Sequence, residues 1–169
     1  MKYIIQLLAA ICFPVFVFCQ DITGLWKGTI FNNCTQQSLE YEIMISKDKG
    51  KFTALSHTWF LIEGKKYYGI KKVKVRIARD GKIVLQDEQL MEDNYPMLPY
   101  KNVRQLNILD LASQGTDTRL EGPFVTNRTK EFDELTGYIN IKRVSESSQS
   151  SLMQYLNRGI IGNDITVVK

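Results

Sequence analysis

The stretch Ser38-Leu39-Glu40-Tyr41-Glu42-Ile43-Met44-Ile45-Ser46 decides the fold class, because its side chains alternate between apolar and polar along most of its length. One face carries Leu39, Tyr41, Ile43 and Ile45, and the other carries Ser38, Glu40, Glu42 and Ser46. Such alternation is typical of a β-strand with one buried and one solvated face. No apolar stripe of helical period follows until the end of the chain, so the sequence predicts an all-β protein.

The same alternation recurs along the chain in runs that are separated by turn residues such as Glu63-Gly64-Lys65 and Asp80-Gly81. Short links between neighbouring runs predict an antiparallel up-and-down order, and eight strands suffice to close a small barrel. We expect an eight-stranded antiparallel up-and-down barrel, with a two-sheet sandwich as the alternative. The eight runs cover about 24–32, 37–47, 51–62, 66–78, 82–89, 102–112, 117–125 and 135–144.

The two ends of the chain predict a leader and a tail. Residues 1–19 combine one lysine with a mostly apolar run that contains Pro14, which is typical of a cleaved secretory signal peptide. That run is too short for a membrane span, so we expect a secreted or periplasmic protein without stable membrane insertion. The barrel domain is expected over 20–144. Residues 145–169 are expected to form a polar linker, then a short helix that contains Leu152, Tyr155 and Leu156, and then a tail.

The charge and cysteine content of the chain limit the partners and covalent links that we expect for this protein. The chain has 22 Lys plus Arg against 18 Asp plus Glu, and loss of Lys2 with the leader leaves 21 against 18, which favours no nucleic acid or other polyanion. The basic stretch 65–79 largely follows outward strand positions, so we expect solvated charge there. Removal of residues 1–19 leaves Cys34 as the single cysteine, which excludes an internal disulfide. We expect Cys34 to be buried or half-buried.

The sequence carries little that points to catalysis. His57 is the single histidine, which excludes any triad or metal site that needs two imidazoles. We expect it to be a hydrogen-bonded residue of the barrel wall or a ligand contact. The clusters 87–88 and 92–94 lack the spacing of a calcium loop and predict solvated charge. We therefore expect no enzyme, no catalytic residue, no metal and no cofactor, with an esterase or isomerase as the least favoured hypothesis.

The first and last runs carry a candidate pair for closing the barrel. Trp26 opens the first run and Arg143 lies near the end of the eighth. A guanidinium plane stacks well on an indole face, so these two side chains can meet where the first and last strands pair. We expect this pair to be structural.

The same residues carry a family resemblance. Gly24-Leu25-Trp26 resembles the first signature of the lipocalins and wider calycin barrels, and Arg143 matches the family's closing arginine. Thr116-Asp117-Thr118 is loosely similar to the family's Thr-Asp-aromatic signature, although the aromatic is missing. The segment 22–26 also resembles the opening of avidin-like barrels, whose tryptophan-rich biotin cage has no counterpart here. The first link, about 33–36, is shorter than the lid loop of lipocalins.

The resemblance implies a secreted, lipocalin-like carrier that holds a small apolar or amphipathic molecule in its barrel and performs no catalysis. The alternative is a protein-protein interaction or structural module with a filled barrel, using its outer face and the 90–101 loop toward a protein partner. For the carrier, we expect ligand contacts from Tyr41, Ile43, His57, Val73, Val75, Leu120 and Phe124.

Overall fold

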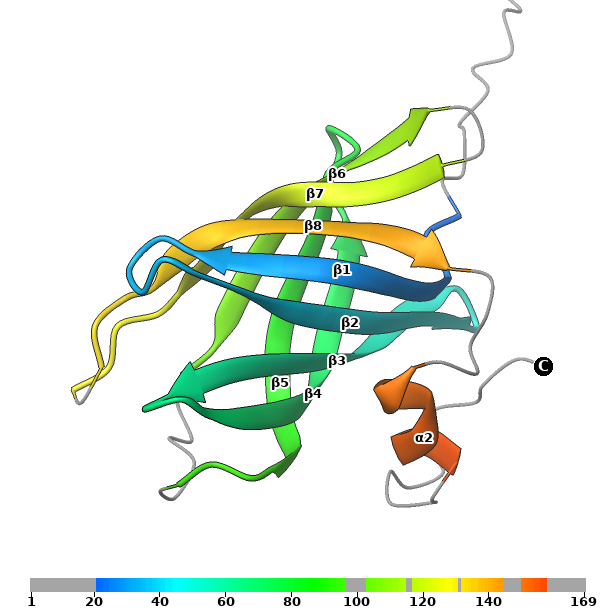
Figure 1. Ribbon diagram of the computed structural model, residues 1–169. Coiled ribbons are helices and arrows are strands. Elements are labelled where there is room, and N and C mark those ends of the chain that lie inside the picture. Colours follow the sequence, from blue (N-terminus) through cyan, green and yellow to red (C-terminus); the bar gives the residue numbers. More distant parts are fainter. Residues whose placement is uncertain (1–20, 97–102, 115–116, 131, 145–149, 158–169) are drawn as a thin grey trace, which may run out of the picture.

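The computed structural model describes residues 21–96, 103–114, 117–130, 132–144 and 150–157, which form eight strands and one helix (Figure 1). The predicted signal peptide, most of the predicted linker, the tail and part of the longest loop lie outside the described residues. The elements are β1 (Gly24–Asn32), β2 (Gln37–Asp48), β3 (Lys51–Ile62), β4 (Lys65–Ile77), β5 (Ile83–Asp93), β6 (Gln105–Gln114), β7 (Asp117–Thr126), β8 (Thr136–Val144) and α2 (Ser151–Asn157).

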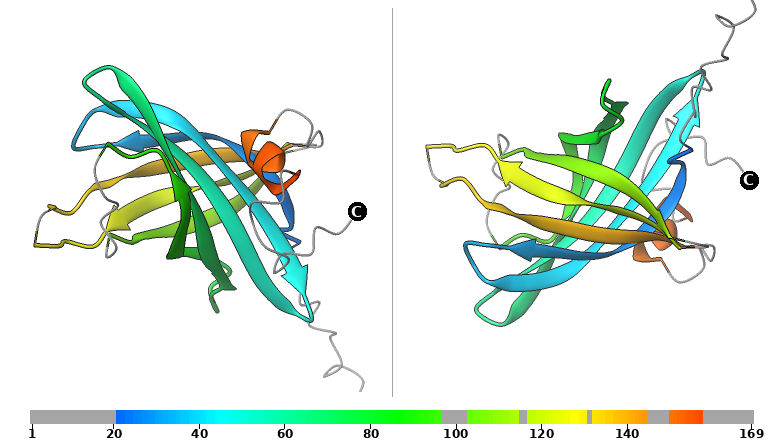
Figure 2. Two further views of the ribbon diagram at one scale, coloured as in Figure 1. Left: turned by 90° about the horizontal axis from the view of Figure 1, so that it is seen from below. Right: turned by 90° about the horizontal axis from the view of Figure 1, so that it is seen from above.

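The strands close into a barrel in which each pairs antiparallel with its neighbours in the chain, and β1 pairs with β8 (Figures 1 and 2). This confirms the predicted up-and-down barrel and excludes the two-sheet sandwich. The arrangement is compatible with calycin barrels. The predicted short terminal helix is confirmed as α2.

The barrel has two distinct ends. We call "mouth" the end that carries the links β1–β2, β3–β4, β5–β6 and β7–β8, and "floor" the end where β1 begins and β8 ends (Figure 1). At the floor, Trp26 faces Arg143 across the β1–β8 pair. The Arg143 guanidinium carbon lies 4.9 Å from the centroid of the indole ring. The predicted closure pair is therefore confirmed.

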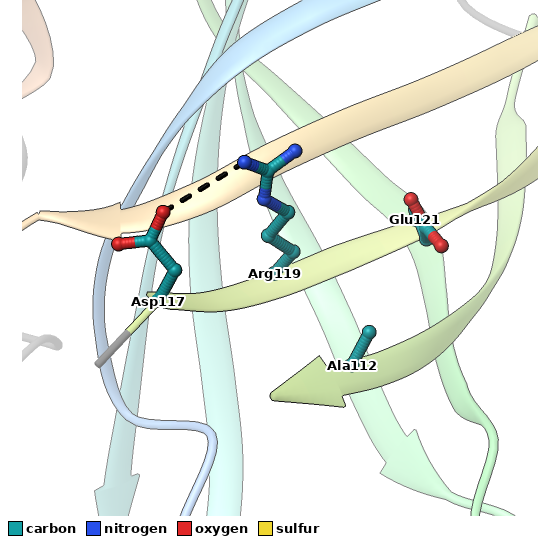
Figure 3. Close-up of a pocket in the computed structure, with 4 residues that line it drawn as sticks. All are labelled: Ala112, Asp117, Arg119 and Glu121. Carbon is teal, nitrogen blue, oxygen red and sulfur yellow. Dashed lines mark ion pairs between the residues drawn. The ribbon is translucent and has the colours of Figure 1, made fainter. Parts of the chain in front are cut away.

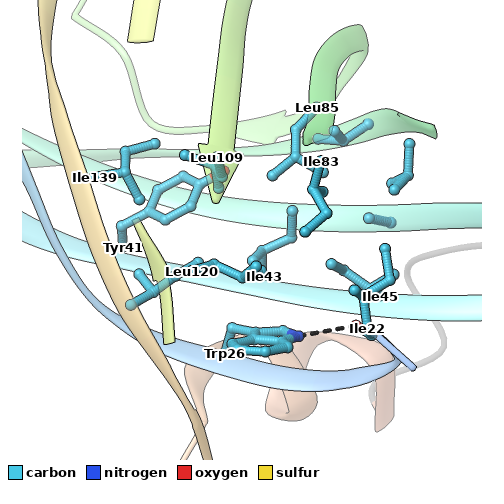
Figure 4. Close-up of a cluster of buried hydrophobic side chains, with 14 of the residues drawn as sticks. Ile22, Trp26, Tyr41, Ile43, Ile45, Ile83, Leu85, Leu109, Leu120 and Ile139 are labelled. Atoms are coloured by element: carbon cyan, nitrogen blue, oxygen red, sulfur yellow. Dashed lines mark hydrogen bonds between the residues drawn. The ribbon is translucent and has the colours of Figure 1, made fainter. Parts of the chain in front are cut away.

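Apolar side chains fill the barrel from the floor upward (Figure 4). Trp26 is fully buried among them, and its Nε1 donates a hydrogen bond to the carbonyl oxygen of Ile22 at 3.0 Å. Every second residue of each strand contributes, as the period of two requires. The buried cluster includes Ile30, Tyr41, Ile43, Ile45, Ala54, Val73, Val75, Ile83, Leu85, Leu109, Leu120, Phe124, Ile139 and Ile141.

Strand β5 departs most from the predicted pattern. It continues to Asp93, into the stretch expected to be an irregular link, and pairs with β4 through two register shifts. Among the described residues its pairing with β6 is short, because Ile83–Gln86 lies in register with Leu106–Leu109 and no further pairs follow. The β5–β6 seam is thus the shortest that the described residues form.

Helix α2 packs on the outside of the barrel, against β2 and β3 (Figure 1). Its Leu152 is buried against Leu55 and Ile70, which point outward from β3 and β4. This explains why β3 has apolar residues on both faces. Among the described residues, no helix has the length and apolar character that crossing a membrane would require.

Cys34 corrects one expectation. It lies in the tight link between β1 and β2 and is exposed, so the predicted burial is wrong. The reason is local: the side-chain oxygen of Asn32 accepts hydrogen bonds from the backbone amides of Cys34 and Thr35, and these bonds hold the turn outside the barrel.

Candidate functional site

Toward the mouth, the side of the barrel interior formed by β2 to β6 is polar, whereas Ile30, Phe124 and Ile139 keep the side formed by β1, β7 and β8 apolar. We call "polar cluster" the six inward-facing residues Tyr41, Ser56, Lys71, Asp87, Gln105 and Asn107, which come from five neighbouring strands. Tyr41, Ser56 and Asn107 are each only 1% exposed. The phenol of Tyr41 is hydrogen-bonded with Ser56 and Asn107. Burial, and secondly the negative charge of Asp87, raise the pKa of Tyr41, so this phenol remains neutral.

An ion pair forms the charged part of the polar cluster. The Nζ of Lys71 lies 2.5 Å from the Oδ2 of Asp87, and the backbone amide of Gln105 donates to the same oxygen at 3.1 Å. The Nε2 of Gln105 donates to the Oδ1 of Asn107 at 2.7 Å, which joins the ion pair to the group around Tyr41. A carboxylate and an ammonium are thus held inside the barrel by direct contacts.

Strand geometry explains why these residues face inward. In β4, Lys71 shares the face of Val73 and Val75, and in β5 Asp87 shares the face of Ile83 and Leu85. The expectation that Asp87 carries solvated charge is therefore wrong, because its side chain is only 9% exposed. Period-two counting from the apolar neighbours would have placed both residues inside.

Polar inward residues also explain β6. By polarity alone, the apolar side chains of this strand change from one face to the other between Ile108 and Leu109. The structure shows β6 in register with β7 without a shift, with Gln105, Asn107 and Leu109 all buried on one face. The strand is therefore regular, and the amide side chains of Gln105 and Asn107 occupy inward positions that polarity alone would assign to solvent.

Three aromatic rings lie between the polar cluster and the mouth. We call "aromatic trio" Phe60, Tyr67 and Tyr95. The ring of Phe60 lies 5.9 Å from that of Tyr67 and 5.0 Å from that of Tyr95, measured between centroids. Gly69 gives Tyr95 its place, because a side chain at position 69 would collide with the tyrosine hydroxyl. Burial, and then the charges of Asp93 and Asp87, raise the pKa of Tyr95.

The predicted ligand contacts divide into two groups. Six of them are brought together inside the barrel, and they belong to the same buried cluster: Tyr41, Ile43, Val73, Val75, Leu120 and Phe124. Figure 4 shows Tyr41, Ile43 and Leu120 turned toward one another. Tyr41 alone of the six belongs to the polar cluster, and the other five are apolar wall.

His57 lies elsewhere. It pairs with Glu42 and Ile70 on the outer face of the barrel, where its ring stacks on Trp59 at 3.7 Å and meets the edge of Tyr155 from α2 at 5.5 Å. Neither ring nitrogen has a hydrogen-bond partner within the described part of the chain, so the prediction of a hydrogen-bonded histidine is wrong. Burial lowers the pKa of His57 to about 4. His57 therefore does not line the barrel interior.

The outer wall also carries a small hollow between β6 and β7 (Figure 3). It has a volume of about 100 Å³ and is lined by Ala112, Asp117, Arg119 and Glu121. Arg119 and Asp117 form an ion pair across it at 3.7 Å. Within the described ranges, no group of three or more His, Cys, Asp or Glu side chains is arranged to hold a metal ion.

Comparison with protein-family models, with curated proteins and with solved structures finds no match to this chain. The polar cluster and the aromatic trio therefore provide the basis for a functional assignment.

Proposed function

We propose that this protein is a lipocalin-like binding protein that holds a small apolar or amphipathic molecule in its barrel, through the mouth, without catalysing a reaction. The observation that carries the proposal is the polar cluster, which lies inside the barrel directly beneath the aromatic trio. Small-molecule sites commonly combine apolar and aromatic walls with a few convergent polar groups that set the orientation of the ligand.

The cost of the ion pair supports this assignment. A buried ion pair is often no more stabilising than apolar residues of similar volume, because both charges lose their hydration. The floor of the same barrel is filled by apolar residues such as Ile45 and Ile83, so apolar filling is available to this fold. Placing Lys71 and Asp87 in the other half is therefore better explained by recognition of a ligand than by stability.

The proposal includes no chemical step. His57, the one imidazole of the chain, faces away from the barrel interior and contacts Trp59 and α2 instead. We also propose, from the pattern of residues 1–19, that the protein is secreted or periplasmic.

Titration with the neutral fluorescent probe N-phenyl-1-naphthylamine tests the proposal. Phe60 and Leu61 are neighbours on β3, but Phe60 belongs to the aromatic trio whereas Leu61 is exposed on the outer face. We expect Phe60→Ser to weaken probe binding about tenfold, the loss of about 1.4 kcal/mol of contact energy. Leu61→Ser is the matched control and should leave the affinity unchanged. Equal effects of both changes, or no binding by the wild type, would contradict a site inside the mouth.

A second candidate function rests on the outer wall. Ile108 and Tyr138 are exposed there, 38% and 45% respectively, with Pro123 paired to Tyr138 between them. Such an apolar row suits an interaction module with a protein partner, the alternative reading of the sequence. Crosslinking in material from the native source would favour it if a second polypeptide is captured by the wild type and lost in Tyr138→Ser.

A further inference from the structure

We infer that the molecule held in the barrel presents an uncharged polar head, a hydroxyl or an amide, to Lys71 and Asp87, with its apolar body toward the mouth. This inference rests on the proposed function and narrows it to one class of ligand. The support comes from the unused hydrogen-bonding capacity of the ion pair, its charge balance and its position beneath the aromatic trio.

The ion pair has donors and an acceptor to spare. The Oδ2 of Asp87 receives both Lys71 Nζ and the amide of Gln105, whereas its Oδ1 accepts no hydrogen bond from any described residue. An ammonium has three N–H donors, and Asp87 is the one described hydrogen-bond partner of Lys71. The Lys71 side chain is 18% exposed and that of Asp87 is 9% exposed, so the pair is not completely sealed from solvent. A group that both donates and accepts fits this pair.

The charge balance selects against ionised heads. Lys71 and Asp87 neutralise each other, and the other members of the polar cluster are neutral side chains bonded to one another. A carboxylate or ammonium placed beside the pair would lose its hydration without gaining an unpaired counter-charge. A hydroxyl or amide does not carry this cost.

The aromatic trio fixes the direction of the ligand. Phe60, Tyr67 and Tyr95 lie on the mouth side of the ion pair, whereas its floor side along β4 and β5 is filled by apolar residues of the buried cluster, namely Val73, Val75, Ile83 and Leu85. An apolar chain or ring system attached to the head therefore extends toward the mouth, where it packs on these rings. The ligand class is thus a long-chain or polycyclic alcohol or amide.

Competition for N-phenyl-1-naphthylamine with four ligands of one chain length tests the inference: dodecanol, dodecanamide, dodecanoate and dodecylammonium, near neutral pH. In the wild type, we expect the alcohol and the amide to displace the probe at concentrations about tenfold lower than the two ions. Equal displacement by all four, or a preference for either ion, overturns the inference while the proposed function stands. Absence of probe binding in the wild type overturns the proposed function itself.

Charge variants make the test specific to the ion pair. Asp87→Asn leaves the ammonium of Lys71 unpaired, so dodecanoate should become the best competitor, whereas Lys71→Met leaves the carboxylate and should favour dodecylammonium. Lys72→Met is the matched control, because Lys72 points outward and lies 3.8 Å from Glu88. Its ranking of the four ligands should equal that of the wild type. An unchanged ranking in the two interior variants overturns the inference.

The interior variants could unfold, since each leaves one buried charge without its partner. The double variant Lys71→Met with Asp87→Leu removes both charges and is expected to retain the barrel, as judged by circular dichroism. It should bind the probe but lose the preference for the alcohol and the amide over the ions by about tenfold. Retention of the wild-type ranking in the double variant also overturns the inference.

Discussion

Arg143 lies over the indole of Trp26, with its guanidinium carbon 4.9 Å from the ring centroid, and the two residues face each other across the pair formed by the first and last strands. The same guanidinium donates a hydrogen bond from Nη2 to the carbonyl oxygen of Asp21, at the start of the described chain. Trp26 and Arg143, which close the barrel, thus lie near the beginning of the first strand and the end of the last strand. Closure of the floor depends on contacts that form only when the ring of strands is complete.

The first prediction concerns Trp26. Its side chain is fully buried and donates a hydrogen bond to Ile22, so Trp26→Ala should lower the free energy of unfolding by about 3 to 5 kcal/mol. Denaturant unfolding followed by circular dichroism measures this change. Tyr138→Ala, at an exposed position, is the control and should cost far less. A loss below about 1 kcal/mol for Trp26→Ala would contradict its place at the barrel floor.

The second prediction concerns the seam between β1 and β8. A Cβ added at Gly28 would run into the backbone carbonyl oxygen of Asn140, and backbone atoms cannot move aside as a flexible side chain can. We expect Gly28→Ala to destabilise the protein by about 1 to 3 kcal/mol, although alanine suits a strand better than glycine does. Thr29 is the next residue and is exposed, so Thr29→Ala should change the midpoint of denaturant unfolding little. Equal midpoints for both variants would argue against this close approach.

The third prediction concerns the attachment of α2. The carboxylate of Glu42 accepts from the hydroxyl of Ser150 at 2.8 Å and the amide of Leu152 at 3.2 Å, and it pairs with Lys27 at 2.9 Å. Burial alone would raise the pKa of Glu42, but these donors outweigh it and hold the pKa below the ordinary value. Glu42→Ala should therefore release the helix, at a cost of about 2 to 3 kcal/mol.

Hydrogen exchange of Ser151–Asn157 measures this release. Protection of the helical amides should fall in Glu42→Ala while the strands remain protected. Glu40→Ala is the matched control, because Glu40 lies two residues earlier on the same face, has a side chain that is 68% exposed, and forms its ion pair among the described residues with Lys66. If both variants keep a protected helix, Glu42 does not anchor α2.

The fourth prediction concerns pH. The ordinary pKa of histidine is 6.5, and burial of His57 lowers its pKa in the folded protein to about 4, so the fold favours the neutral ring. The stability that this preference contributes is complete above about pH 6.5 and is lost as the pH falls from there to about 4. The melting temperature should decline across this interval.

His57→Phe isolates this effect, because the variant keeps an aromatic ring against Trp59 and cannot titrate. The difference in melting temperature between wild type and variant should shift in favour of the variant as the pH falls from 6.5 toward 4. The negative charges of Glu42 and Glu40 partly oppose the effect of burial, and their contribution is already contained in the His57 pKa of about 4. Parallel curves would show that folding leaves the pKa of His57 unchanged, which would contradict the prediction.

The sequence was sufficient to predict all eight strands, their order and the stack of Trp26 on Arg143, because these depend on alternation, turn chemistry and the pairing of the first and last strands. It was insufficient where side-chain polarity and strand position disagree. Lys71 and Asp87 occupy inward positions by the period of the strand, whereas charged side chains are normally solvated, so strand period and polarity indicate opposite faces for these two residues.

His57 shows the opposite case. Leu55, His57 and Trp59 share the outer face of β3, and only the docking of α2 makes that face a buried one. A single strand cannot reveal which of its two apolar faces points into the barrel when a distant helix covers the other. The assignment of His57 to the interior failed for this reason.

The short pairing between β5 and β6 has a consequence for how the molecule would come apart. Within the described part of the chain the other seams are longer, and the mouth-side part of β5 has its backbone partners on β4. If the β5–β6 seam opens first under mechanical force or in denaturant, every strand is still paired with at least one neighbour. The closed barrel would then become an open, curved sheet with β6 and β5 as its edge strands. Mechanical stretching or partial denaturation should then reveal an intermediate that has lost its ring closure while its hairpins persist.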